Sequence, residues 1–164
     1  MKINETILYL GQEYHLEYKD TDRFSMLPYD KCKQVYGVCF YGNKIVVGFS
    51  RKMKKWSLIG GTIEPGELFT QTLRREVQEE SNMKVIKSWP IGYQKVVEED
   101  IYQLRYACVV EPYGEFISDP DATENNGVDK IKLVGINEFI SYVKWGQIGE
   151  QMLKRSIEKL KIHI

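Results

Sequence analysis

A chain of 164 residues with 43% hydrophobic residues can bury one sizeable core but is too short for two ordinary domains and a linker, so we expect a single domain over residues 1–164. The 23 Lys and Arg residues balance the 23 Asp and Glu residues, and the sequence pI is about 6.7. This balance argues against a protein that attracts nucleic acid or an anionic membrane through bulk charge, so we expect no stable complex with either.

The cysteines and the apolar segments indicate where the protein resides. Cys32, Cys39 and Cys108 form no Cys-x-x-Cys pair, and their odd number argues against a disulfide framework. We expect reduced thiols in or near the core. No stretch has the character of a signal peptide or the length of a membrane helix, so the expected location is the cytoplasm.

In chain order, the apolar and turn residues predict strands first and then one helix. Two hairpins are predicted, residues 7–10 with 14–18 around Gly11-Gln12, and residues 35–41 with 45–49 around Gly42-Asn43. A helical pattern covers residues 67–82. Further strands are predicted at residues 85–97, 101–110 and 131–136, and helices at residues 137–143 and 147–161. Strands around one central helix, with more helix at the end, predict an α/β or α+β sandwich on a mixed sheet.

The helix predicted at residues 67–82 places acids beside its apolar face. At about 100° per residue, one sector that should face the core holds Phe69, Leu73 and Val77. The adjoining sector holds Glu76, Glu79 and Glu80, which we therefore expect beside the core and not on the solvent face. Acids three or four residues apart repel each other by about 0.2–0.5 kcal/mol per pair. A divalent cation such as magnesium, which prefers oxygen ligands, would offset this repulsion.

Three glutamates on a helix are more often a solvated charged face than a metal site, so the residues upstream decide between these interpretations. Gly60-Gly61 predicts a flexible turn that lets backbone approach a ligand. Glu64-Pro65-Gly66-Glu67 then leads into the helix. A loop followed by a helix N-terminus suits a phosphate group.

These residues together resemble a known motif. Five residues separate Gly61 from Glu67, seven separate Glu67 from Arg75, and the segment then continues Arg75-Glu76-Val77-Gln78-Glu79-Glu80-Ser81-Asn82-Met83. This segment, residues 61–83, resembles the Nudix box of the Nudix hydrolases, including the MutT-like proteins. It covers 23 of the 164 residues. The resemblance implies a Nudix-type α/β/α sandwich with a mixed central sheet, preceded by an N-terminal extension at residues 1–34.

The resemblance also implies a role for each residue of the motif. Glu76, Glu79 and Glu80 would bind Mg²⁺ or Mn²⁺, with the carbonyl of Gly60 as a further ligand. Glu67 and Arg75 would pair and brace the loop against the helix. These residues would serve the attack of water on a phosphorus of a diphosphate, with Glu79 as a candidate base.

Two positions depart from the family pattern without touching a metal ligand. Asn82 stands where the family usually has Gly, and Ile59 stands where Pro is common. Asn is the residue that best replaces Gly in a left-handed conformation, so we expect Asn82 to end the helix. Ile59 removes some rigidity before Gly60.

The general base and the phosphate contacts are open outside the box. An acid from a turn could serve as the base, and the sequence offers two groups: Glu98, Glu99 and Asp100, or Asp119, Asp121 and Glu124. Gly61 and the basic cluster just upstream, which includes Arg51 and Lys55, are candidates to contact substrate phosphates. His15 and His163 form no metal or triad pattern and receive no function.

The substrate is a small-molecule nucleotide on this interpretation, and its class depends on residues outside the box. A chain near the minimum size for the fold favours a (deoxy)nucleoside triphosphate or an oxidised nucleotide. The alternatives are ADP-ribose or a nucleotide sugar, a capped or triphosphorylated RNA end, and a non-catalytic nucleotide sensor. A sensor is disfavoured because no acid of the box is missing. The chain would act as a monomer or as a homodimer joined through residues 1–34.

Overall fold

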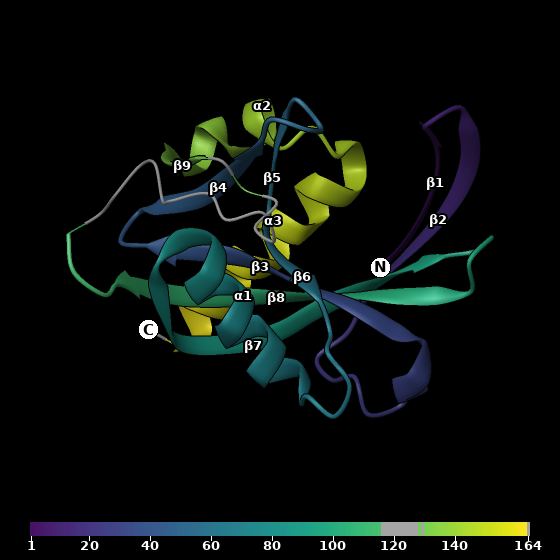
Figure 1. The fold of residues 1–164 in the computed structure, drawn as a ribbon, viewed down its shortest axis with the longest axis horizontal. Helices are drawn as coiled ribbons and strands as arrows, with labels where there is room; N and C mark the ends of the chain where they lie inside the picture. Colours follow the sequence, from purple (N-terminus) through teal and green to yellow (C-terminus); the bar gives the residue numbers. More distant parts are fainter. Residues whose placement is uncertain (116–127, 129, 164) are drawn as a thin grey trace.

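The computed structural model describes residues 1–115, 128 and 130–163, which fold around one mixed sheet (Figure 1). Seven strands lie in the order β1-β2-β7-β8-β3-β4-β5, while β6 pairs with β3 and β9 pairs with β4. The pair β3–β8 is parallel and the other pairs are antiparallel. The strands are β1 (Lys2–Tyr9), β2 (Gln12–Asp20), β3 (Cys32–Tyr41), β4 (Lys44–Ser50), β5 (Lys55–Ser57), β6 (Ile59–Thr62), β7 (Met83–Val96), β8 (Ile101–Pro112) and β9 (Lys130–Gly135).

Helices cover both faces of this sheet. On one face α1 (Phe69–Ser81) buries Leu73 and Val77 in a cluster with Val35 and Leu104 of β3 and β8. On the other face α3 (Gly146–His163) packs over a second cluster, with α2 (Phe139–Tyr142) beside it (Figure 1). Two short 3-10 turns, Tyr29–Lys31 and Ile136–Glu138, complete the described elements. The prediction of an α/β/α sandwich on a mixed sheet is confirmed.

Several element boundaries differ from the sequence prediction. The first hairpin extends back to Lys2, and its strand β2 joins the main sheet through β7. The flexible turn predicted at Gly60-Gly61 is wrong, because both glycines lie in β6 and pair with β3. Apolar and polar residues do not alternate over this short strand, so its pattern gave no strand signal.

The central helix is shorter at its start than predicted and ends where predicted. It begins at Phe69, and the amide of Leu68 just before it donates to Oε1 of Gln71 at 2.7 Å. Its last residue is Ser81, and Asn82 follows as the C-terminal cap, with a left-handed φ of 52° and ψ of 40°. The amide of Asn82 donates to the carbonyl of Gln78 at 2.9 Å. The expectation that Asn82 terminates the helix is confirmed, and β7 begins at the next residue.

The cysteines and the lengths of the helices also bear on the sequence predictions. Cys32, Cys39 and Cys108 are buried and free, as predicted. Within the described ranges, no helix combines the length and the apolar character needed to cross a bilayer.

The left-handed residue at the end of α1 yields a test of local stability. We expect Asn82→Ala to lower the free energy of unfolding by about 1 kcal/mol, because the left-handed region costs an L-residue about 1–2 kcal/mol and Ala lacks the local hydrogen bonds of Asn. Asn82→Gly should not lower it, because glycine adopts this conformation without strain. Urea denaturation of the two variants and the wild type measures both values. A Gly variant as unstable as the Ala variant would contradict this account.

Candidate active site

The glycines of β6 bring the backbone against two acids of α1. The amide of Gly60 donates to Oε1 of Glu80 at 2.7 Å. A Cβ added at Gly60 would lie 2.1 Å from the carbonyl oxygen of Val35, and one added at Gly61 would lie 2.6 Å from the carboxylate carbon of Glu76. Any side chain at these positions would therefore push β6 away from β3 or displace the Glu76 carboxylate. The absence of a side chain sets the geometry of the site.

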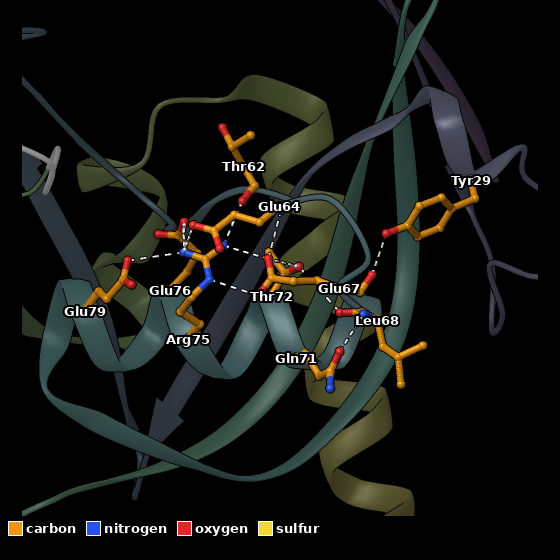
Figure 2. Close-up of polar contacts among 10 residues, drawn as sticks. All are labelled: Tyr29, Thr62, Glu64, Glu67, Leu68, Gln71, Thr72, Arg75, Glu76 and Glu79. Carbon is orange, nitrogen blue, oxygen red and sulfur yellow. Dashed lines mark hydrogen bonds and ion pairs between the residues drawn. The ribbon is translucent and has the colours of Figure 1, made fainter.

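Arg75 joins the loop before α1 to the helix itself (Figure 2). Its Nε and Nη2 donate to the two carboxylate oxygens of Glu67 at 2.9 and 2.8 Å, and Nη2 also donates to the carbonyl of Thr62 at 2.9 Å. The hydrogen bonds from Arg75 hold the pKa of Glu67 at about 2, with help from the amide of Glu64 and the hydroxyl of Thr72. A two-point contact between a guanidinium and a carboxylate fixes direction as well as distance. Glu67 and Arg75 thus hold the loop against the helix.

The same guanidinium also contacts two of the three acids implied as metal ligands. Nη1 of Arg75 donates to Oε1 of Glu76 at 2.9 Å and to Oε2 of Glu79 at 3.2 Å (Figure 2). Glu80 is 7% exposed and the side chain of Glu76 is 14% exposed, whereas that of Glu79 is 54% exposed. The expectation that all three lie beside the core is wrong for Glu79. The reason is that β6 covers the side of α1 that carries Glu76 and Glu80 and leaves Glu79 open.

Burial makes Glu80 and Glu76 hard to ionise. It raises the pKa of Glu80 to about 8, against the opposing effect of the Gly60 amide. Burial also raises the pKa of Glu76, and Arg75 opposes it. Carboxylates that are costly to ionise are stabilised by a cation, and oxygen-only donors suit Mg²⁺ or Mn²⁺. Within the described residues no preformed group of three His, Cys, Asp or Glu side chains holds a metal geometry. Instead, Arg75 lies against Glu76 and Glu79.

The turn acids considered as general bases have different surroundings. Glu98 accepts hydrogen bonds from the amide and ring of His15, and Asp100 pairs with Lys31 and Lys95. Glu99 lines the cavity described below. The other group, Asp119, Asp121 and Glu124, lies outside the described residues.

A cavity of about 660 Å³ lies next to the strand partner of Gly60, and the acids of α1 are not part of its lining. Tyr36 lines it and pairs with Gly60 in the sheet. Burial raises the pKa of Tyr36, Arg105 opposes this effect, and the carboxylates of Glu80 and Glu76 add to it. Lys55 also lines the cavity, whereas Arg51 is exposed in the turn after β4 and is absent from the lining.

Sequence reasoning missed the polar floor of this cavity. Its members are Gln34 of β3, Gln94 of β7, and Gln103 and Arg105 of β8. The signal was a charged residue inside an otherwise apolar strand segment, Leu104-Arg105-Tyr106-Ala107-Cys108. A charge at such a position is rarely buried unless something pairs with it.

Comparisons with known proteins concern the family and the fold. The model of the NUDIX domain family matches residues 33–155. No curated protein sequence matches the chain. The pyrophosphohydrolase BsRppH of Bacillus subtilis, solved as a point mutant, has a similar structure at a TM-score of 0.64 and 16% identity, over 94% of this chain and 97% of that one.

Two further solved structures are similar at lower scores. A MutT protein from Bacillus halodurans gives a TM-score of 0.56 at 14% identity, covering 73% of this chain and 78% of its own. An Ap4A hydrolase of C. elegans, solved as a binary complex, gives 0.57 at 13% identity, covering 79% and 99%. At these identities the likeness shows the fold.

The burial of Glu80 yields a test that needs no substrate. Its folded-state pKa of about 8 lies above its ordinary value of 4.5, so the wild type loses stability as pH rises from 4.5 to about 8. Gln at this position can accept the Gly60 hydrogen bond without a charge. We therefore expect Glu80→Gln to raise the Tm of the metal-free protein at pH 8 by about 2–8 °C and to change it little at pH 4.5.

Differential scanning fluorimetry with a chelator, at both pH values, measures these shifts. Glu150→Gln, at an exposed position of α3, is the matched control and should not change the Tm at either pH. An equal or lower Tm for Glu80→Gln at pH 8 would contradict the assigned cost of burial.

Proposed function

We propose, from the premise that this chain belongs to the Nudix family of pyrophosphohydrolases, that it hydrolyses the diphosphate of a (deoxy)nucleoside triphosphate or an oxidised nucleotide with the help of magnesium. The observation that carries this proposal is the position of two shielded carboxylates. Glu80 and Glu76 lie against the two glycines of β6, and Gly60 pairs with Tyr36, which lines a cavity large enough for a nucleoside.

The donor set fits a divalent ion. Glu76, Glu79 and Glu80 would hold it, with the carbonyl of Gly60 as a further ligand, and Mn²⁺ would serve as well as Mg²⁺ because both accept hard oxygen donors. When bound, such an ion supplies charge neutralisation of the phosphate oxygens and lowers the pKa of water. The missing Cβ of Gly61 leaves room for the Glu76 carboxylate on the strand side.

The chain's own residues divide the remaining work. Arg75 and Glu67 fix the loop and the first turns of α1, so the acids keep their places when their charge is neutralised. The amide of Gly60 orients the Glu80 carboxylate through Oε1. Glu79 is exposed enough to accept a proton from the attacking water, and Glu99 at the cavity is the alternative acceptor.

Phosphates would meet the cationic side of the cavity mouth. Lys55 and Lys144 both line the cavity. Gly61 lets the backbone approach, and Arg51 lies in the exposed turn before Lys55. Positive side chains near the acids would balance the negative charge of a polyphosphate.

The substrate class is decided by a panel of compounds. We expect phosphate or pyrophosphate release with magnesium from one class among nucleoside triphosphates, oxidised guanine nucleotides, ADP-ribose, nucleotide sugars and dinucleotides. Glu80→Gln should lower kcat/KM by about 100-fold or more, because it removes a ligand carboxylate whose contribution is several kcal/mol. Glu150→Gln should retain wild-type turnover.

Each result of the panel has a distinct meaning. Turnover that persists in Glu80→Gln at saturating magnesium would exclude the proposed metal site. Turnover of ADP-ribose or a nucleotide sugar alone would replace the triphosphate assignment. Tight binding without turnover of any compound would identify the chain as a nucleotide sensor.

A further inference from the structure

The cavity that Tyr36 lines has a polar floor, an aromatic side and walls from distant parts of the chain. Strands β3, β7 and β8 supply the floor, the β1–β2 hairpin supplies one wall, and Trp145 just before α3 supplies another. Glu5 of β1 lies close to Gly146, where α3 begins. The cavity is therefore closed by segments that do not carry the acids of α1.

Arg105 is a buried cation without an acidic partner. It is 1% exposed, and its guanidinium lies 4.9 Å from the ring centre of Tyr36 and 5.3 Å from that of Trp145. Nη1 donates to the carbonyl of Leu104 at 3.4 Å and Nη2 to Oε1 of Gln103 at 3.3 Å, while Nε has no hydrogen-bond partner among the described residues. No described carboxylate forms an ion pair with it.

Such an arrangement is costly for folding alone. Both hydrogen bonds are long, and an uncompensated buried charge is strongly destabilising. Two aromatic rings offset only part of that cost. A guanidinium with an unused donor at a cavity wall indicates a ligand that brings an acceptor.

A row of three glutamines next to Arg105 also offers a hydrogen-bond donor to a ligand. Arginine has no acceptor, so the Gln103 atom that faces it is the oxygen, which also accepts from Nε2 of Gln94 at 2.9 Å. The Nε2 of Gln103 then donates to Oε1 of Gln34. This order leaves the amide nitrogen of Gln34 as a donor at one end of the row and the oxygen of Gln94 as an acceptor at the other.

We infer that this cavity binds the base of the substrate nucleotide and selects a 6-oxopurine, guanine or hypoxanthine, through Arg105 and Gln34. The inference rests on the proposed function, because it assigns the base subsite of that same site. Guanine presents two neighbouring acceptors, O6 and N7, to donors that have no acceptor. Adenine presents its N6 amino group at the position of O6, and two facing donors leave both unsatisfied.

The remaining contacts of the cavity agree with this choice. The acceptor end of the row, Oε1 of Gln94, suits the N1–H and N2 amino groups that guanine carries and adenine lacks. Tyr36 connects this subsite to the acids, because it lines the cavity and pairs with Gly60. A base held here would therefore extend its phosphates toward Glu76 and Glu80.

The test uses nucleoside monophosphates, which contain no anhydride to hydrolyse. Isothermal titration calorimetry without divalent ions measures the Kd of GMP, IMP and AMP for the full chain. We expect GMP and IMP to bind at least about tenfold more tightly than AMP. Equal binding, tighter binding of AMP, or no binding of any of the three at millimolar concentration would overturn the inference.

Two variants and one control separate recognition from folding. Arg105→Met should keep or raise the Tm, because it replaces an unpaired buried charge with an apolar side chain of similar length, and should abolish the preference for GMP over AMP. Gln34→Leu should reduce the same preference. Gln147→Leu, on the exposed side of α3, should leave both affinities unchanged.

The outcomes of this test and of the hydrolysis panel are independent. A preference retained in Arg105→Met overturns the inference, and if that variant fails to fold, an unchanged preference in Gln34→Leu does so. A GMP preference in a protein that hydrolyses no compound of the panel would contradict the proposed hydrolysis and support the base subsite. Hydrolysis without any preference among bases would support the proposed hydrolysis and contradict the base subsite.

Discussion

The close approach of β6 to both β3 and α1 is the constraint on which the site depends. Only glycine fits at position 60, since a Cβ there would meet the backbone of β3, and a Cβ at Gly61 would displace the carboxylate of Glu76. The approach brings the Gly60 amide to Glu80 and shields that acid from water. It also pairs Gly60 with Tyr36 of β3, which lines the cavity. One packing constraint thereby sets the burial of Glu80 and joins its strand to a strand of the cavity floor.

Some charged groups of the site have a partner of opposite charge and others do not. Glu67 is strongly stabilised as an anion because Arg75 binds both of its oxygens. Glu80 has one backbone hydrogen bond and is held where ionisation is unfavourable. The carboxylate that braces the loop has a cationic partner within the chain, whereas Glu80 has no cationic partner among the described residues. Arg105 is the opposite case, a cation left short of negative charge at the far side of Tyr36. Glu80 and Arg105 are thus groups of opposite charge, each without a charged partner among the described residues. A ligand that carries hydrogen-bond acceptors together with a bound cation would satisfy both.

The sequence predicted what depends on local spacing and missed what depends on distant contacts. The position of α1, its end at Asn82 and its apolar face follow from a 3.6-residue period and from the tolerance of Asn for the left-handed region. The exposure of Glu79 does not follow from this period, because it depends on which side of the helix β6 covers. The pair Gly60-Gly61 predicts a turn, because glycine is typical of turns. The structure has a strand there, in which glycine allows the close approach of the neighbouring backbone. Arg105 is one of 23 cations, and only the sheet order, which brings β3, β7 and β8 together, shows that it is buried beside a row of glutamines.

The acids of α1 and the walls of the cavity come from different parts of the chain. The family model covers residues 33–155, which include the acids, the glycines and the three strands of the cavity floor. The β1–β2 hairpin lies before that range and contributes Ile7, Tyr9 and Tyr14 to the cavity. It joins the sheet through β2 and β7, so its position depends on the same strand that carries Gln94. A change in the hairpin would alter the wall of the base subsite without moving α1. The acids can therefore remain fixed by β6 and Arg75 while the shape of the cavity varies, which is how one catalytic arrangement can serve different leaving groups and bases.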